Sequence, residues 1–209
     1  MNITSLDALR ALHDPVRERS AKKEMPQLDA HATRLIALSP FVVIASGALG
    51  GSMDASPRGG APGFVKAVDA HTLLIPDAPG NNRLDTLENI VSHGEQGAPL
   101  GLLFMLPGMD ETLRVNGGAL ISTLDADRVL AAEPQRMPKL VIRVTVQACY
   151  LHCAKALMRS SLWDPAHHVQ RATLPSMGEM MRDQIREFRG DEVVAETQQE
   201  MLARYQQSL

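Results

Sequence analysis

Short apolar runs separated by turn residues fill the middle of the chain and predict β-strands. The run Phe41–Ser46 is apolar, rich in β-branched residues and followed by glycine, which is typical of a buried strand. Pro107-Gly108 and Asn116-Gly117 mark turns between further runs, and the second pair predicts a tight hairpin turn. Strands at this spacing favour an antiparallel barrel over alternating strand–helix units. The other predicted strands are Phe64–Val68, Thr72–Ile75, Leu100–Leu106, Thr112–Asn116, Ala119–Thr123 and Leu140–Tyr150.

Helical patterns frame these strands. The predicted helices are Ser5–Leu12, a segment from its cap Asp29 to Leu38, Arg83–Val91 with Asn82 as its cap, Leu151–Arg159, and a C-terminal helix that begins with a capping box at Ser176-Met177-Gly178-Glu179. The glycine- and proline-rich stretch from Gly47 to Gly63 predicts a long loop. We expect one domain over residues 1–209, with a helical N-terminal extension (1–39) and a helical C-terminal segment (174–209).

Composition excludes several classes of protein. The formal net charge is −3, which gives no field that would gather nucleic acid, and aromatic residues make up only 3%, too few for base-stacking platforms. The longest apolar stretches, around Phe41–Ala45 and Leu100–Leu106, are far too short to span a bilayer. The N-terminus has no basic region followed by an apolar core. We therefore expect a cytoplasmic protein without a nucleic-acid or membrane partner.

The residues most suited to metal binding or nucleophilic catalysis form no complete site. Cys149 and Cys153 lie four residues apart with His152 between them, in a stretch that looks like the start of a helix. No second pair of ligands stands at zinc spacing, so we expect no metal. Because the chain lacks a G-x-S-x-G elbow, a Walker loop and an H-E-x-x-H motif, we assign no catalytic residue.

One turn has the features of an anion site. Pro79-Gly80-Asn81-Asn82-Arg83 lies between a predicted strand and a predicted helix. A helix N-terminus offers unpaired N–H groups and the positive end of the dipole, and Arg83 adds a forked, permanent charge. The alternative is an ordinary capped turn with a solvated arginine.

Three further groups of residues could serve a ligand or only the fold. Arg58 lies in the glycine-rich loop, where it could reach an anion or be mobile. Lys155 and Arg159 share one predicted helical face with His152, and this face could contact a ligand or solvent. Trp163 follows in the sequence and could pack on a ligand ring or in the core. Arg114, before the predicted hairpin turn, could face a cavity or water.

Taken in order, these segments resemble a known family. The motifs are SPRGG (56–60), GFV (63–65), TLLIPD (72–77), PGNNRLDTLENI (79–90), LLFMLPG (102–108), ETLRVNG (111–117) and HCAKALMRSSLW (152–163). Together they resemble a bacterial subgroup of the FMN-binding split barrels related to pyridoxamine 5'-phosphate oxidase. The resemblance implies a mainly β fold with flanking helices, a Greek-key split β-barrel of the FMN-binding type, and a homodimer with FMN at the subunit interface.

The resemblance also implies where FMN would be held. Arg58 and the turn Asn81-Asn82-Arg83 would hold the phosphate and ribityl chain, and the backbone of Phe64 and Val65 would contact the edge of the isoalloxazine ring. Arg114 is included as a cofactor-binding residue. Lys155, Arg159, Ser160 and Trp163 would reach the flavin from the partner subunit.

The expected function is that of an FMN-dependent oxidoreductase acting on a small molecule. Where pyridoxamine 5'-phosphate oxidases have a basic residue, this chain has Pro62 and Gly63. We therefore do not expect it to be a true pyridoxamine 5'-phosphate oxidase. One alternative is a flavin- or haem-binding carrier or sensor without turnover, since seven histidines are available as axial ligands. Another is a reductase that uses a deazaflavin.

Overall fold

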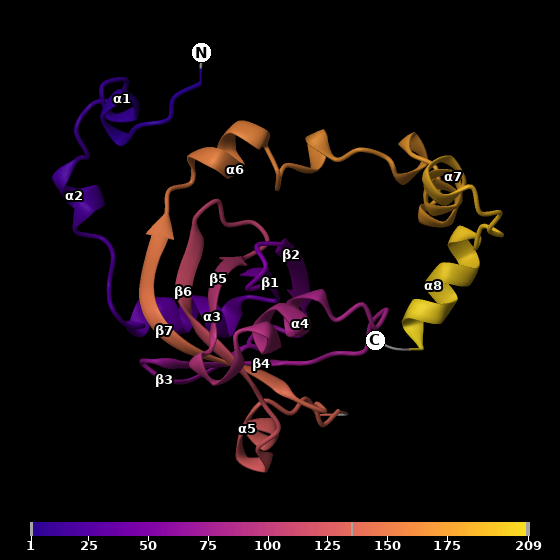
Figure 1. The fold of residues 1–209 in the computed structure, drawn as a ribbon, viewed down its shortest axis with the longest axis horizontal. Helices are drawn as coiled ribbons and strands as arrows, with labels where there is room; N and C mark the ends of the chain where they lie inside the picture. Colours follow the sequence, from indigo (N-terminus) through magenta and orange to yellow (C-terminus); the bar gives the residue numbers. More distant parts are fainter. Residues whose placement is uncertain (1, 135, 208–209) are drawn as a thin grey trace.

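The fold is built on one antiparallel sheet of seven strands (Figure 1). The structure is a computed structural model that describes residues 2–134 and 136–207, so the ends of the two expected terminal segments, residue 1 and residues 208–209, lie outside the described residues. The strands are β1 (Phe41–Gly47), β2 (Met53–Gly59), β3 (Lys66–Asp69), β4 (Thr72–Pro76), β5 (Ala98–Met105), β6 (Thr112–Ser122) and β7 (Val141–His152).

The strand order is β2-β1-β5-β6-β7-β4-β3. Three consecutive strands, β5 to β7, form a meander, and β4, which precedes them in the chain, returns beside β7. This is a Greek-key arrangement. Among the described residues the two edge strands, β2 and β3, do not pair with each other, so the sheet stays open. The expected fold class, mainly β with flanking helices, is confirmed.

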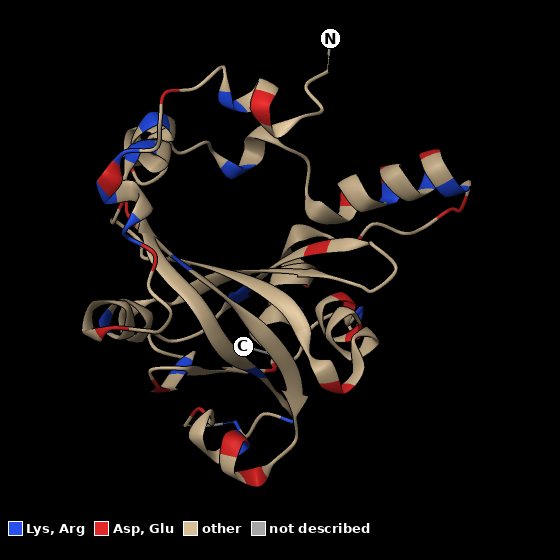
Figure 2. Cartoon of the chain, turned by 60° about the vertical axis from the view of Figure 1, so that its left-hand side comes forward, with Lys and Arg blue, Asp and Glu red and all other residues tan. Residues whose placement is uncertain are grey.

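Eight α-helices lie within the described residues, and most charged residues are on helices and loops (Figure 2). They are α1 (Leu6–Arg10), α2 (Glu18–Ala21), α3 (Ala30–Leu38), α4 (Asp85–Ser92), α5 (Asp125–Leu130), α6 (Lys155–Ser160), α7 (Met177–Arg189) and α8 (Gln198–Gln206). Short 3-10 turns follow at Gly94–Gln96, Pro165–His167 and Arg171–Thr173. No described helix has both the length and the apolar character needed to cross a membrane.

One face of the sheet forms the core, and we call it the inner face. Alternate residues of β1 and β5, such as Ile44 and Phe104, are fully buried there. Helix α4 packs on this face against β1, β5 and β6, while α3 packs beside β3. Residues on the other side of the same strands, the outer face, are partly exposed. This sidedness decides which candidate residues can meet.

The segment Met53–Gly59, predicted as part of a loop, is strand β2. It pairs with β1 along its whole length, from Phe41 opposite Gly59 to Gly47 opposite Met53. Its side chains alternate between exposed and partly buried, as expected for an edge strand, but those of the partly buried row are polar. The sequence of β2 has no apolar alternation and therefore gave no strand signal. Pairing with β1 stabilises this strand instead.

The predicted hairpin turn at Asn116-Gly117 is wrong, because both residues lie inside the long strand β6. The pairing of β6 with β7 shifts register between these two residues, which is the mark of a β-bulge. A Cβ atom on Gly117 would lie 2.1 Å from the carbonyl oxygen of Thr145. The glycine is therefore required by close approach of two backbones and not by a turn.

Three predicted boundaries also move. Strand β7 continues to His152, so the predicted helix Leu151–Arg159 is wrong in its first part and Cys149 lies in a strand. Helix α4 begins at Asp85, so Asn82 is not its cap. The predicted strand Phe64–Val68 begins only at Lys66.

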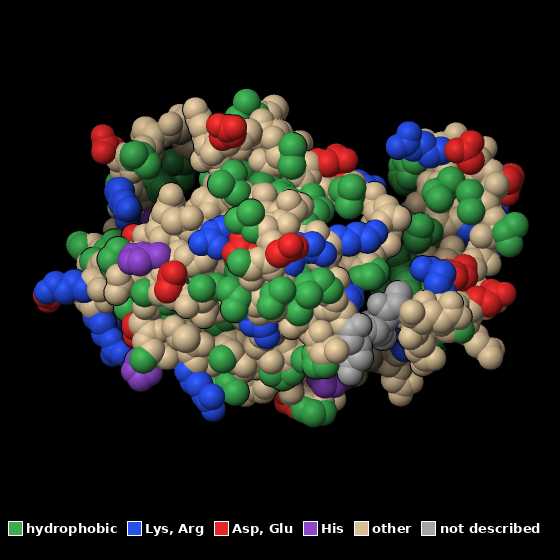
Figure 3. All heavy atoms as spheres, turned by 90° about the horizontal axis from the view of Figure 1, so that it is seen from below, with side chains coloured by type: hydrophobic (Ala, Val, Ile, Leu, Met, Phe, Trp, Pro, Cys, Tyr) green, Lys and Arg blue, Asp and Glu red, His purple; other side chains and the backbone are tan. Residues whose placement is uncertain are grey.

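The predicted terminal helices are confirmed. Ser5 caps α1, and the side chain of Asp29 accepts a hydrogen bond from the Ala32 N–H at 2.8 Å to cap α3. The capping box of Ser176 and Glu179 opens α7. Helices α7 and α8 contact each other and stand as a lobe beside the main body (Figure 3).

Candidate functional site

The first turn of α4 lies against β2, and polar side chains join the two elements. The Thr86 hydroxyl donates to a carboxylate oxygen of Asp54 at 2.5 Å and accepts from Nη2 of Arg58 at 3.2 Å. Ser56 Oγ donates to the same carboxylate oxygen at 3.0 Å. Asp54, Ser56 and Arg58 alternate along β2 and therefore project from the same, inner side of the sheet.

The same face of α4 is tied to β1 further along. Asn89 Nδ2 donates to Ser46 Oγ at 2.9 Å, and His93 Nε2 lies 2.8 Å from the carbonyl oxygen of Gly47. Thr86, Asn89 and His93 have the i, i+3, i+7 spacing of one helical face. These contacts hold the helix on the sheet and keep its N-terminus beside Arg58.

The loop before α4 has a strained backbone. Asn82 and Leu84, on either side of Arg83, have φ angles of 59° and 61°. A leucine in this left-handed region costs on the order of 1–3 kcal/mol, and such residues cluster at binding sites. Leu84 is the residue before the helix and offers no side-chain cap, so the first N–H groups of α4 have no side-chain acceptor.

The carboxylates of Asp85 and Asp54 partly offset the positive charge of Arg83. Arg83 Nε donates to Asp85 Oδ2 at 2.8 Å, and this hydrogen bond lowers the pKa of Asp85. The same hydrogen bond raises the pKa of Arg83, and the negative charge of Asp54 raises it slightly further. The pair is exposed, with 73% of the Arg83 side chain and 43% of the Asp85 side chain accessible. Solvent screens such a pair, so an incoming anion can compete for Arg83.

A second feature lies on the outer face, where the sheet forms an open cavity of about 370 Å³. Arg114, Asn116 and Gln147 supply its polar side, and Met53 part of its apolar side. Arg114 Nε donates to Asn116 Oδ1 at 3.0 Å. Arg114 therefore faces the cavity, while Arg58 projects from the opposite face of the sheet.

The remaining expected cofactor residues are dispersed. Phe64 and Val65 are buried in the core, with 4% and 2% exposure, just before β3. Lys155, Arg159 and Ser160 are exposed on α6, and Trp163 Nε1 donates to the carbonyl oxygen of Met109 at 2.8 Å. Helix α6 follows the end of β7 and lies apart from α4 in Figure 1.

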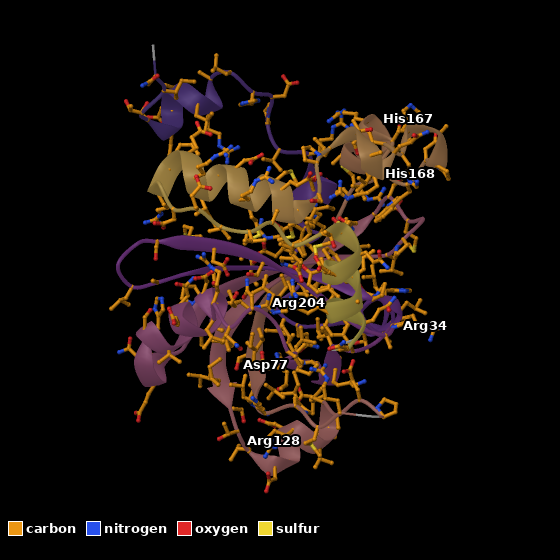
Figure 4. The ribbon with its side chains drawn as sticks, turned by 90° about the vertical axis from the view of Figure 1, so that its right-hand side faces the viewer. Arg34, Asp77, Arg128, His167, His168 and Arg204 are labelled. Atoms are coloured by element: carbon orange, nitrogen blue, oxygen red, sulfur yellow. The ribbon has the colours of Figure 1, made fainter. Side chains whose placement is uncertain are left out.

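The cysteines and paired histidines form no common site. Burial, with a smaller effect of Asp29, raises the pKa of the Cys149 thiol to about 11, whereas Cys153 is exposed. His167 and His168 lie in the segment between α6 and α7 (Figure 4), where His167 Nδ1 is 3.1 Å from a carboxylate oxygen of Asp164. Within residues 2–134 and 136–207, no three His, Cys, Asp or Glu side chains are grouped to hold a metal.

Sequence reasoning missed the polar partners of Arg58. Asp54 was missed because it lay in a predicted loop, and Thr86 was missed because only the apolar face of its helix was considered. The available signal was the row of Thr86, Asn89 and His93, polar residues at helical spacing on the face that packs against the sheet.

Comparison with known proteins gives structural similarity only. No family model matches the chain, and no curated protein matches it. HupZ of Group A Streptococcus is 17% identical with a TM-score of 0.45, covering 58% of this chain and 91% of its own. A structure from Lactobacillus delbrueckii, described as a candidate pyridoxamine 5'-phosphate oxidase, is 19% identical with a TM-score of 0.46, covering 61% of this chain and 98% of its own.

An FMN-binding protein from Syntrophomonas wolfei is also similar. It is 11% identical with a TM-score of 0.43, and the match covers 58% of this chain and 84% of that protein. The solved structures that this chain resembles thus include one described as a candidate pyridoxamine 5'-phosphate oxidase and one described as an FMN-binding protein. Each of these three matches extends over about three fifths of this chain.

Proposed function

We propose that this chain is an FMN-binding flavoprotein, active as a homodimer, that carries out oxidoreductase chemistry on a small molecule. The observation that carries the proposal is the uncapped N-terminus of α4, held beside the partly buried Arg58 and preceded by Arg83. A phosphate monoester is the ligand group that best fits an N–H-rich helix start flanked by two arginines.

The local geometry fits the phosphate end of FMN. Arg58 is anchored by its bonds to Thr86 and to the Pro57 carbonyl, which uses part of its five-donor fork and leaves the rest for an anion. Asn81 and Asn82 lie in the same loop and supply amide donors. The positive φ of Leu84 turns the chain into the helix so that the first-turn N–H groups are available.

The rest of the proposed cofactor site needs a second subunit. Lys155, Arg159, Ser160 and Trp163 lie on or after α6, away from α4, so in our proposal they reach the flavin bound by the partner. Phe64 and Val65 contribute backbone groups, since their side chains are in the core. Arg114 projects from the outer face, on the opposite side of the sheet from Arg58, so we do not assign it to the phosphate end of the cofactor.

Bound FMN would supply the electron-transfer chemistry, and the protein would bind and orient it. In this proposal, the residues around the start of α4 hold the phosphate end of the ligand. None is placed to act as an acid or base on a substrate. We propose His152 only as a candidate source of a proton for the substrate, and unchanged turnover in a His152→Gln variant would rule out this role. True pyridoxamine 5'-phosphate oxidase activity is not part of the proposal.

The first test is the absorption spectrum of the purified protein, with the released chromophore identified by mass. We expect flavin bands and FMN. A Soret band would identify a haem protein instead, and a released deazaflavin would identify the third cofactor class. Protein that is colourless and takes up no added FMN would overturn the proposal.

The second test weakens the phosphate end alone. Arg58→Ala should raise the dissociation constant for FMN by roughly 10- to 150-fold, the range for one lost charge-assisted hydrogen bond. Arg34→Ala is the matched control, because Arg34 is exposed on α3 (labelled in Figure 4) and should leave binding unchanged. Flavin fluorescence quenching measures both. Equal affinity in the two variants would show that the phosphate is bound elsewhere.

A further inference from the structure

Three basic side chains converge on one tyrosine at the outer face of β7. The ammonium group of Lys23 lies 4.7 Å from the centre of the Tyr150 ring, and the guanidinium carbon of Arg114 lies 5.6 Å from it. The His152 ring centre is 5.2 Å from that of Tyr150, with the planes tilted by 57°. We call Lys23, Arg114, Tyr150 and His152 the Tyr150 cluster.

Sheet pairing builds the cluster from distant parts of the chain. Arg114 on β6 lies opposite Tyr150 on β7, and His152 is two residues further along, on the same side of the strand. An isolated bridge between Met25 and Cys149 draws the N-terminal segment alongside β7. That bridge brings in Lys23, whose ammonium group donates to the carbonyl oxygen of Leu151 at 2.9 Å.

The cluster has no internal counter-charge. Within the described residues, none of Lys23, Arg114 and His152 has a carboxylate within ion-pair distance. Burial lowers the pKa of His152, and the charges of Lys23 and Arg114 lower it further. Placing like charges together costs free energy that a bound anion would recover. Tyr150 offers both cations the negative face of its ring, which holds them close without neutralising them.

The cluster is open to a ligand and adjoins the outer-face cavity. Lys23 and Arg114 are exposed, while Tyr150 and His152 are partly buried, so donors at the surface surround a sheltered floor. Arg114 belongs both to the cluster and to the cavity lining. We propose that the Tyr150 cluster binds the carboxylate or phosphate group of a small organic anion whose remaining atoms occupy this cavity.

This site is distinct from the proposed FMN phosphate site. Arg58 and Thr86 are on the inner side of the sheet, beneath α4, whereas Arg114 and Tyr150 project from the outer side. The inference therefore goes beyond the proposed function and names the chemical class of a second ligand. It stands even if the chain binds no flavin.

Ring proton NMR of His152 tests the site without any turnover assay. The signal is assigned by its loss in His152→Gln, and its pH titration is followed with inorganic phosphate, acetate or acetamide at constant ionic strength. A bound anion stabilises the imidazolium form, so we expect phosphate or acetate to raise the pKa of His152 by more than half a unit. Acetamide, the neutral match of acetate, should not. The stronger of the two anions identifies the head group.

Lys23→Ala gives a second signature. Removing one positive neighbour should raise the pKa of His152 in the absence of any anion, and the response to the anion should fall at least several-fold. Lys22→Ala is the control, because Lys22 is exposed and pairs with Glu18. Purified protein saturated with FMN should keep the full anion response.

Four results would overturn the inference. They are no shift with either anion, equal shifts with acetate and acetamide, an undiminished response in Lys23→Ala, and loss of the response on saturation with FMN. The last would assign the cluster to the flavin phosphate. Failure to bind FMN at all, with the anion response intact, would instead reject only the proposed function.

Discussion

At the scale of single residues, Gly117 shows how one missing side chain allows the central pair of strands to form. The bulge between Asn116 and Gly117 brings the backbone of β6 against that of β7, with Thr145 O only 2.1 Å from where a Cβ would lie. A Cβ atom on Gly118, the next residue, would lie 3.9 Å from its nearest neighbour, Nε2 of Gln147. Adjacent glycines in one strand thus differ in whether the fold requires them.

We therefore predict that Gly117→Ala lowers the free energy of unfolding by about 1–3 kcal/mol, the range for forced overpacking. Gly118→Ala should change it by less, because the added methyl group meets only open space and one flexible glutamine. Urea denaturation of both variants measures the difference. Equal stabilities would mean that the bulge can relax at no cost.

Burial also affects the ionisation of Cys149. Burial raises the pKa of Cys149 from 9.0 to about 11, so folding favours the neutral thiol. The stability that this shift provides is complete below pH 9 and is lost as the pH rises to about 11. Unfolding free energy should thus fall more steeply between pH 9 and 11 in the wild type than in Cys149→Ala.

A thiol reagent at pH 8 gives an independent check of this assignment. Cys153, which is exposed, should react at once, and Cys149 only when urea unfolds the chain. Two fast-reacting thiols in native protein would contradict the burial of Cys149. The Cys153→Ser variant supplies the control, since its single remaining thiol should stay protected.

At the scale of elements, the sequence predicted those that carry their own signal. Strand β1 has an apolar run, and α3 and α7 have side-chain caps, so local chemistry was enough. Strand β2 has neither, because its stability comes from the backbone of β1. The predicted helix start at Leu151 is wrong because β7 continues there, paired with β6 as far as Thr112 opposite His152. Long-range pairing overrides local propensity in each case.

The candidate site was predictable to the same extent. Arg58 and the Asn81-Asn82-Arg83 turn stood out from motif order, and Arg58 lies beside the helix that this turn precedes. The Tyr150 cluster was hidden because Lys23, Arg114 and Tyr150 are far apart in the chain and meet only through strand register and the Met25–Cys149 bridge. No local pattern encodes such a register.

At the scale of the whole molecule, the outer face of the sheet is a surface with two halves. One row of side chains crosses β1, β5, β6 and β7 and consists of Val43, Leu103, Arg114 and Tyr150. The row is apolar at the β1 and β5 end and carries the cationic Tyr150 cluster at the other end. The apolar end, with Met105 nearby, remains partly exposed. A second copy of the chain would cover it and would bring α6 to the partner's flavin, which is why we propose a homodimer.

Sedimentation of the flavin-loaded protein should therefore give twice the 22.7 kDa of one chain. Leu103→Glu, which places a charge in the apolar end, should shift the mass to that of a monomer and lower FMN affinity together, because burying an unpaired carboxylate is costly. Val129→Glu on α5, at 61% exposure, is the matched control and should leave both unchanged. A monomer that still retains FMN at full affinity would contradict the shared site, since Lys155 and Arg159 would then have no route to the cofactor.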